Sequence, residues 1–249
     1  MASDYAVFDY AFNGSRAAAP VFALSLKEAG SMGLDGGEFS APRAALFESL
    51  GIARERVFAC RQSHSRAVAL ADMSGPRVLE ADGLAGIGEA VLTVTVADCL
   101  PVYLSDMKSG AFALCHSGWK GTGIAISALR LMALVFGTKP SDVVCVLGPC
   151  VQGSCYQVDR TRADAFNAEF GRLPGVYPAG APVRTEEDGR GTAYFLDMQA
   201  ANAKILYDYG VKTIERRTEC TLCGAPFGSF RREGESFTKM MALSGLFNA

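Results

Sequence analysis

Short runs of β-branched and apolar residues, separated by polar turns, are the clearest pattern in this chain and predict β-strands. These runs cover residues 67–71, 92–96, 111–116 and 143–147. The second run ends just before Cys99, where Pro101 disfavours helix for the residue that precedes it. In the third run, the alternation places His116 on the same face as Phe112 and Leu114. Cys99 and His116 are therefore expected at strand ends, where folds commonly carry functional residues.

Helical periodicity predicts helices over residues 41–50, 122–136, 160–170, 198–209 and the last dozen residues. The first has Pro42 near its start and Gly51 just past its end, which is typical of helix boundaries. The stretch 13–40 is rich in glycine and small residues and predicts irregular structure, and the proline- and glycine-rich stretch 174–191 predicts an exposed loop. Because strands and helices follow one another in mixed order, we expect an α+β layered fold rather than a doubly wound parallel sheet.

Composition excludes several classes of protein. The 249 residues are 49% hydrophobic and 20% charged, as in a soluble globular protein with one large or two small domains. The net charge of −2 gives no reason to expect a nucleic acid or an anionic membrane as a partner. No apolar run approaches the roughly 18 residues of a membrane span. Asp4 and Asp9 stand where a signal peptide would carry its basic start, so we expect a cytoplasmic location.

The chain has only two histidines, His64 and His116, and both lie in segments that could converge with Cys99. Two imidazoles and one thiolate are strong ligands for Zn²⁺, and a three-ligand site leaves a fourth position for water or substrate, as in catalytic zinc sites. We therefore predict a zinc site at these three residues. Spacing alone leaves a second interpretation open, in which the histidines are hydrogen-bonded loop residues and Cys99 is an ordinary buried thiol.

The other cysteines fall into two groups. They are Cys60, Cys115, Cys145, Cys150, Cys155, Cys220 and Cys223. The first three stand in apolar strand-like segments and are predicted to be core residues. The last four form a Cys-x4-Cys pair and a Cys-x2-Cys pair, which could together form a four-thiolate structural zinc site, although only the second pair has the usual spacing. A disulfide would require an oxidising compartment, which the N-terminus does not support.

Four blocks of the sequence carry a resemblance to a known family. They are Thr95-Val96-Ala97-Asp98-Cys99-Leu100-Pro101-Val102; Cys115-His116-Ser117-Gly118-Trp119-Lys120-Gly121; Leu147-Gly148-Pro149 with Cys155-Tyr156-Gln157-Val158; and Cys220-Thr221-Leu222-Cys223 with Ser229-Phe230-Arg231-Arg232. In this order they resemble the YfiH-type family. That family was long labelled polyphenol oxidase or laccase-domain and is now associated with zinc-dependent purine nucleoside phosphorylase activity.

The resemblance implies a fold, a ligand set and an activity. The implied fold is a single domain over 1–249, a layered α/β sandwich with mixed β-sheets similar to the catalytic domain of cytotoxic necrotizing factor toxins. The implied zinc ligands are His64, Cys99 and His116, the same residues that ligand chemistry alone selects. The implied reactions are phosphorolysis of adenosine, inosine and 5′-methylthioadenosine and deamination of adenosine, with purine nucleosides and phosphate as the small-molecule partners.

Other residues of these blocks have two interpretations each. Lys120, Arg231 and Arg232 are candidate cations for phosphate, and a solvated surface role is equally open for each. Trp119 could stack on a purine or pack in the core. Asp98 could orient a metal ligand or accept a backbone hydrogen bond at the strand end.

The sequence departs from the family pattern at several positions. Lys120 stands where arginine is common, so a bidentate anion contact becomes a contact with a point charge. Phe237-Thr238-Lys239 stands where Thr-Gly-Arg is usual, and residues 27–34 only loosely match the Gly-Gly-Val-Ser signature. These departures bear on the substrate rather than on the metal ligands.

Other function classes stay open at this point. A multicopper oxidase needs many histidines, which this chain lacks, so copper enters only as a single-ion alternative to zinc. A metal-free hydrolase or amidase, for example one that edits cell-wall precursors, would use Cys99 as nucleophile and His116 as base. A non-catalytic nucleotide-binding module is the third alternative, which the departures at Lys120 and Lys239 favour.

Overall fold

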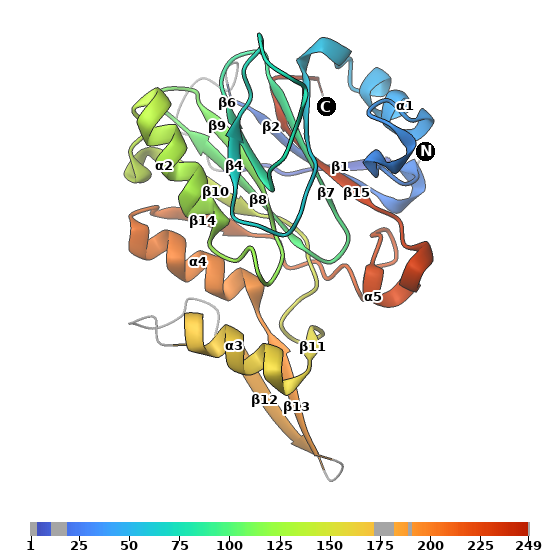
Figure 1. The fold of residues 1–249 in the computed structure, drawn as a ribbon, viewed down its shortest axis with the longest axis vertical. Coiled ribbons are helices and arrows are strands. Elements are labelled where there is room, and N and C mark those ends of the chain that lie inside the picture. Colours follow the sequence, from blue (N-terminus) through green and yellow to red (C-terminus); the bar gives the residue numbers. More distant parts are fainter. Residues whose placement is uncertain (1–3, 11–18, 172–181, 189–190, 249) are drawn as a thin grey trace.

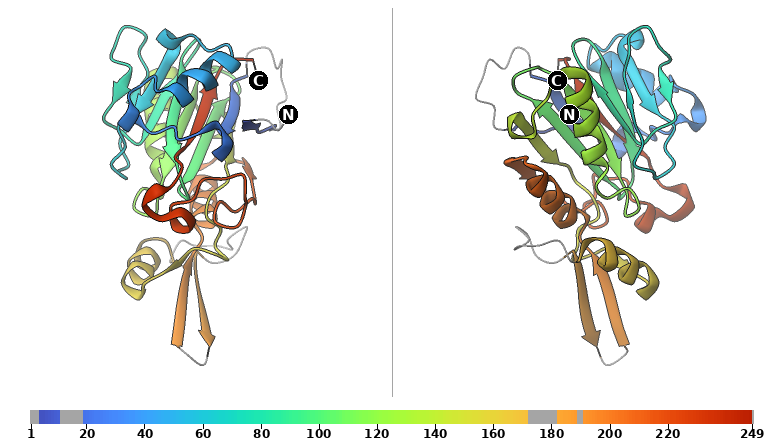
Figure 2. Two further views of the ribbon diagram at one scale, coloured as in Figure 1. Left: turned by 90° about the vertical axis from the view of Figure 1, so that its right-hand side faces the viewer. Right: turned by 60° about the vertical axis from the view of Figure 1, so that its left-hand side comes forward.

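Two six-stranded β-sheets pack face to face in the computed structural model, and helices cover their outer faces (Figure 1). The structure describes residues 4–10, 19–171, 182–188 and 191–248. A smaller three-stranded sheet and one helix project from one end of the sandwich (Figure 2). The layered α+β fold with mixed sheets is therefore confirmed.

The first sheet combines antiparallel and parallel pairs. Its strand order is β1 (Tyr5–Val7), β2 (Val21–Ser25), β15 (Met240–Gly245), β7 (Val91–Val96), β3 (Val57–Cys60) and β5 (Val78–Leu79). The pairs from β1 to β7 are antiparallel, and β3 lies parallel to both β7 and β5. β15 pairs with β7 from Met240 opposite Val96 to Gly245 opposite Val91. The C-terminal strand therefore lies beside the strand that leads to Cys99.

The second sheet is also mixed. Its strand order is β14 (Thr213–Arg216), β10 (Val143–Leu147), β8 (Leu100–Asp106), β9 (Phe112–Ser117), β6 (Gly83–Gly86) and β4 (Val68–Leu70). The outermost pair at each edge is parallel, and the pairs between them are antiparallel. β8 and β9 pair so that Pro101 lies opposite His116, which places the start of one strand beside the end of the other.

Apolar side chains fill the space between the two sheets. Phe22 and Leu92 of the first sheet belong to the same buried cluster as Tyr103 and Leu114 of the second. These strands are buried along nearly their whole length, which explains why they form continuous apolar runs rather than strictly alternating ones. The sandwich thus provides a rigid base for the loops at its end.

Helices close the outer faces of the sandwich. The α-helices of the described residues are α1 (Ala41–Ser49), α2 (Ile124–Phe136), α3 (Arg160–Phe170), α4 (Met198–Tyr209) and α5 (Phe230–Glu233), and those on the outer faces are α1, α2 and α4. α1 packs on the first sheet, while α2 and α4 pack on the second. The small sheet has the order β11 (Gln157–Val158), β13 (Gly191–Leu196) and β12 (Val183–Asp188), and α3 packs beside it. Among the described residues, none of these helices has the length and apolar character needed to cross a membrane.

Three sequence-based expectations need correction or restriction. The prediction of a helix over the last dozen residues is wrong, because residues 240–245 form the buried central strand β15. The reason is that periodicity cannot distinguish a short apolar helix from a strand buried on both faces. The stretch 13–40 is not wholly irregular, since Val21–Ser25 forms β2, while 13–18 lies outside the described residues. In the predicted loop 174–191, Val183–Asp188 forms β12, while 174–181 and 189–190 lie outside the described residues.

Candidate metal centre

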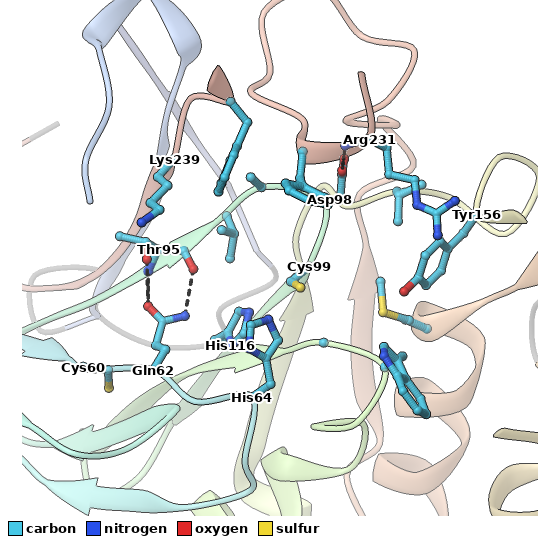
Figure 3. Close-up of a pocket in the computed structure, with 18 of the residues that line it drawn as sticks. Cys60, Gln62, His64, Thr95, Asp98, Cys99, His116, Tyr156, Arg231 and Lys239 are labelled. Atoms are coloured by element: carbon cyan, nitrogen blue, oxygen red, sulfur yellow. Dashed lines mark hydrogen bonds between the residues drawn. The ribbon is translucent and has the colours of Figure 1, made fainter. Parts of the chain in front are cut away.

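Three potential metal ligands converge at one end of the sandwich (Figure 3). His64 lies in the turn that follows β3, Cys99 lies in the short link between β7 and β8, and His116 lies near the end of β9. Their ligand atoms all lie within 4.8 Å of one another, and the two imidazole ring centroids are 4.9 Å apart. The three predicted ligands therefore come together from separate segments of the chain.

Strained backbone marks two of these segments. His64 (φ 61°) and Asp98 (φ 80°) are the only non-glycine residues with positive φ among those that the structure describes. Such a conformation costs about 1–3 kcal/mol and persists only where the surroundings hold it. Asp98 is held by its carboxylate, which accepts hydrogen bonds from Thr221 Oγ1 at 2.7 Å and from the Arg231 backbone N–H at 2.9 Å. The strain thus falls on His64, a candidate ligand, and on Asp98, the neighbour of the candidate ligand Cys99.

The buried Asp82 carboxylate organises both histidines. It accepts the backbone N–H of His64 at 2.9 Å and that of Ser65 at 2.7 Å, and it lies 2.9 Å from Nδ1 of His116. Burial raises the pKa of Asp82, but hydrogen bonds from His116 and the serine turn lower it well below its usual value. Because the ionised carboxylate can only accept, Nδ1 of His116 carries the hydrogen, so Nε2 would be the nitrogen available to a metal.

Gly118 leaves room for the ligands. A Cβ atom at this position would lie 3.0 Å from Cδ2 of His64 and 3.3 Å from Sγ of Cys99. Both contacts are closer than ordinary van der Waals distances, so a side chain here would push against two of the three ligands. The absence of a side chain at Gly118 therefore lets His64 and Cys99 approach this segment closely.

The charges of the site favour a thiolate beside a cation. Burial raises the pKa of the Cys99 thiol, but the charge of His116 and hydrogen bonds with both imidazoles lower it to about 6. Burial lowers the pKa of His116, but the Cys99 thiolate and the Asp82 carboxylate raise it to about 9. The site therefore stabilises a deprotonated sulfur beside a positive charge, and a bound metal ion would supply that charge in place of the His116 proton, which it would displace.

The three residues fit a single divalent metal ion. Two nitrogen donors and one sulfur donor are a common set for zinc, and His116 has the carboxylate-oriented imidazole typical of metal ligands. The donor spacing is compatible with tetrahedral coordination, in which ligand atoms lie roughly 3–4 Å apart. A fourth position would face the cavity that the ligands line.

The cavity beside the ligands has a volume of about 790 Å³. Its wall includes the aromatic rings of Trp119, Tyr156, Phe230 and Phe237 and the cationic side chains of Arg61, Arg162, Arg231 and Lys239. Gln62 is fixed in the wall, because its amide both accepts from the Thr95 N–H at 2.7 Å and donates to the Thr95 carbonyl at 2.9 Å (Figure 3). A cavity with flat apolar faces and cations suits a ligand that has both a ring system and an anionic group.

The other predicted site residues differ in their placement. Arg231 lines the cavity, with its guanidinium 4.8 Å from the centroid of the Tyr156 ring. Lys120 is exposed and does not line the cavity, and Arg232 directs its guanidinium to backbone carbonyls instead. Asp98 lines the cavity, but the partners of its carboxylate are Thr221 and Arg231 rather than a metal ligand. Trp119 both packs on the core and lines the cavity.

Several residues of the site were not predicted from the sequence. Asp82 is not part of a recognisable local motif, because its hydrogen-bond partners Ser65 and His116 lie 17 and 34 residues away along the chain. Arg162 stands over the Trp119 ring at 5.2 Å, yet it belongs to a helix whose charged surface gives no signal of its own. Tyr156 lies inside one of the family-like blocks, and that block was the signal that could have identified it. Cys60, predicted as a core residue, is buried and also lines the cavity.

Comparison with protein families gives one match that covers most of the chain. Residues 29–246 match a model described as multi-copper polyphenol oxidoreductase laccase. That description implies a metal. The two histidines of this chain are too few for several copper sites, so its ligand set supports one metal ion rather than a cluster.

Related sequences and structures extend this match. A purine nucleoside phosphorylase of Streptomyces coelicolor is 34% identical over 229 residues, 88% of this chain and 87% of the relative. One of Mycobacterium tuberculosis is 31% identical over 208 residues, with coverages of 81% and 77%. The crystal structure of YlmD from Geobacillus stearothermophilus has a TM-score of 0.79 at 27% identity, covering 95% of this chain and 94% of that one. The structure of YfiH from Bacillus licheniformis also gives 0.79, at 25% identity and coverages of 91% and 92%.

Proposed function

The chain belongs to the family described as multi-copper polyphenol oxidoreductase laccase. Because relatives about one third identical are named purine nucleoside phosphorylases, we propose that this protein is a zinc-dependent purine nucleoside phosphorylase. Its proposed substrates are phosphate and the nucleosides adenosine, inosine and 5′-methylthioadenosine. Deamination of adenosine is proposed as a second reaction of the same site. The observation that carries the proposal is the convergence of His64, Cys99 and His116 on a cavity lined by aromatic and cationic side chains.

Phosphorolysis makes two demands on the site. A phosphate oxygen attacks C1′ of the ribose, the bond from C1′ to the purine nitrogen breaks, and the purine leaves with the electron pair and takes up a proton. The products are the free base and ribose 1-phosphate, or 5-methylthioribose 1-phosphate when the substrate is 5′-methylthioadenosine. The site must therefore hold an anion on one side of the sugar and stabilise developing negative charge on the base at the other.

The residues of the cavity supply groups for both demands. A zinc ion held by His64, Cys99 and His116 would supply a Lewis acid for the leaving purine. Arg231, fixed against Tyr156, presents a cation at the cavity wall for phosphate. The rings of Trp119 and Tyr156 provide flat surfaces against which a purine can stack.

The same site supports deamination by a different route. Water adds to C6 of adenosine, and ammonia leaves from that carbon, so the nucleoside becomes inosine and phosphate takes no part. Deamination therefore needs the metal ligands but not a phosphate-binding cation. This difference allows the two reactions to be separated by experiment.

An assay with and without phosphate tests the proposal. Purified protein incubated with adenosine and phosphate should release adenine and ribose 1-phosphate, and omission of phosphate should stop this release. Chelation of zinc should abolish the activity and added zinc should restore it, and His64→Ala, Cys99→Ala and His116→Ala should each lose both zinc and turnover. Ammonia formed at the same rate in the absence of phosphate would make deamination the main reaction. Turnover that persists in metal-free protein would contradict zinc dependence.

One observation favours a second candidate, a hydrolase with Cys99 as nucleophile. The lowered pKa of Cys99 and the raised pKa of His116 are also those of a thiolate–imidazolium pair, and Asp82 orients the imidazole as in a catalytic triad. In this mechanism Cys99 forms a covalent intermediate and His64 is dispensable. Activity in metal-free protein, together with covalent labelling of Cys99 and an active His64→Ala variant, would favour the hydrolase.

A further inference from the structure

Three cysteines gather at a second place in the molecule. Cys155 lies in the loop between β10 and β11, and Cys220 and Cys223 lie in the loop between β14 and α5. Their ligand atoms all lie within 4.8 Å of one another, and the sulfur atoms of Cys155 and Cys223 are 3.3 Å apart. All three are free thiols. None of them lines the cavity of the first site.

We propose that Cys155, Cys220 and Cys223 form a second metal site, which binds one zinc ion through three thiolates and leaves its fourth position to solvent. Thiolates select soft and borderline cations such as zinc over magnesium and calcium. Binding would displace one proton from each thiol to solvent, because only the thiolate is a ligand. This site goes beyond the proposed nucleoside chemistry and does not depend on it.

The backbone brings two of the sulfurs to one side of a tight turn. The Gly224 N–H donates to the Cys220 carbonyl at 2.8 Å, which closes a single turn over the Cys-Thr-Leu-Cys-Gly segment. A Cβ at Gly224 would lie 2.8 Å from that carbonyl and 2.8 Å from the Phe227 ring, so the turn requires glycine. A two-residue spacing between cysteines is typical of paired zinc ligands.

Hydrogen bonds direct the third cysteine and support thiolate character. The Gln152 N–H lies 3.5 Å from the sulfur of Cys220, and its carbonyl accepts the N–H of Cys155 at 2.8 Å. The Ser154 hydroxyl lies 3.5 Å from the sulfur of Cys155. A thiolate is a better acceptor than a thiol, so the Gln152 N–H aimed at the Cys220 sulfur favours the metal-binding form of that residue.

The two loops form a frame that holds the sulfurs without a metal. The Thr221 N–H donates to the Cys150 carbonyl at 3.1 Å, within an isolated β-bridge between Cys150 and Cys220. Arg232 Nη1 donates to the carbonyl oxygens of Thr221, Leu222 and Gly224 at 2.8, 2.9 and 3.1 Å. The ligand positions are therefore preorganised by backbone contacts.

Cys150 does not belong to the cluster, which distinguishes this site from a four-thiolate centre. Its side chain is buried, and its thiol lies 3.5 Å from the Val151 carbonyl. Cys223, in contrast, is exposed, and Cys155 and Cys220 are partly exposed. Solvent can therefore reach the open side of the cluster, and a metal ion can enter from it.

The second site also stabilises a support of the first. Thr221, between two of the cysteines, donates its hydroxyl to the Asp98 carboxylate at 2.7 Å, and Asp98 precedes the ligand Cys99. A metal ion at the cysteine cluster would restrict the loop that holds this strained aspartate. Its role would be structural, since it lies outside the reaction cavity.

Metal content measured by mass spectrometry tests the proposal directly. Wild-type protein that is equilibrated with zinc and then separated from unbound zinc should contain about two zinc ions per chain, one at each proposed site. Cys155→Ser and Cys223→Ser should each contain about one, and His64→Ala should also contain about one, because it loses the other ion. Cys150→Ala is the matched control and should keep both. Wild-type protein that holds a single ion, lost in His64→Ala, would overturn the proposal.

A second measurement does not require a cysteine variant to fold. Zinc added to metal-free wild-type protein should slow alkylation of Cys223 by iodoacetamide about tenfold or more, and a chelator should restore the rate. Cobalt bound to His64→Ala should show the intense sulfur-to-metal absorption of a site with several thiolates. Alkylation of Cys223 that zinc does not affect would overturn the proposal, as would a Cys155–Cys223 disulfide in protein purified without reductant.

Discussion

Nδ1 of His116 lies 2.9 Å from Oδ1 of Asp82, and the same carboxylate accepts the backbone N–H groups of the turn that carries His64. A single buried aspartate thus sets the ring orientation of one proposed metal ligand and the backbone of another. Because Asp82 stands just before β6, the sheet itself fixes its position. The precision of the metal site therefore derives from the sandwich rather than from the loops alone.

Asp82→Asn should weaken zinc binding by about 10- to 100-fold, because a neutral amide no longer favours the Nδ1 hydrogen on His116. The substitution keeps the size of the side chain, so the fold should persist. Competition with a chromophoric chelator measures the affinity. Asp106→Asn is the matched control, since Asp106 is a second buried aspartate that accepts turn hydrogen bonds away from the cavity. Equal zinc affinity in both variants would show that Asp82 does not orient His116 for metal binding.

Gly118→Ala should lower zinc affinity about tenfold or more, because the new methyl group would press on the His64 ring and the Cys99 sulfur. Gly75→Ala provides the control, since a Cβ there meets only ordinary contacts at 3.4 Å or more. Both variants should show nearly the wild-type thermal midpoint. A Gly118→Ala variant with full zinc affinity would show that the ligands have more freedom than the structure indicates.

Arg231→Ala should raise KM for phosphate about tenfold or more, because a lost charge-assisted hydrogen bond costs about 1.5–3 kcal/mol. Lys120→Ala should change that KM by less than about twofold, since Lys120 is exposed and does not line the cavity. Steady-state kinetics at saturating nucleoside measure both values. A larger effect from Lys120 than from Arg231 would place the phosphate outside the cavity.

Much of the fold could be predicted from local pattern. The boundaries of α3 and α4 agree with the predicted 160–170 and 198–209, and Asp159 and Asp197 cap both helices by accepting N–H groups of the first turn. β15 could not be predicted, because its side chains are buried on both faces and only pairing with β2 and β7 defines it as a strand. Local pattern therefore identifies elements with capped ends better than central strands.

The candidate site likewise contains residues that could be predicted from the sequence and residues that could not. His64, Cys99 and His116 could be selected because few side chains bind zinc and only two histidines were available. Asp82 could not, since aspartates are common and its role depends on which strand end it occupies. For the remaining cysteines, spacing suggested Cys150, Cys155, Cys220 and Cys223 together, but the fold buries Cys150 and brings only the other three within ligand distance of one another.

Glu233→Gln should destabilise the protein by about 1–2 kcal/mol at neutral pH. One carboxylate oxygen accepts from Lys27 and Arg232, each at 2.9 Å, and the other accepts the Thr238 N–H at 2.9 Å. Burial raises the pKa of Glu233, but these hydrogen bonds and the nearby cations lower it from its usual 4.5 to about 2. The neutral amide would keep only part of these contacts. Urea unfolding compared with wild type measures the difference, and Glu235→Gln, at an exposed position of the same loop, is the control.

The contribution of Glu233 to the free energy of unfolding should depend on pH in a definite direction. A carboxyl group with a lowered pKa in the folded state contributes its full stability above the unfolded value of 4.5, and that contribution is lost as pH falls from about 4.5 toward about 2. The gap in unfolding free energy between wild type and Glu233→Gln should therefore be constant from pH 7 to about 5 and narrow below that. A gap that widens on acidification would show that Glu233 is protonated more readily in the folded state, contrary to its contacts with Lys27 and Arg232.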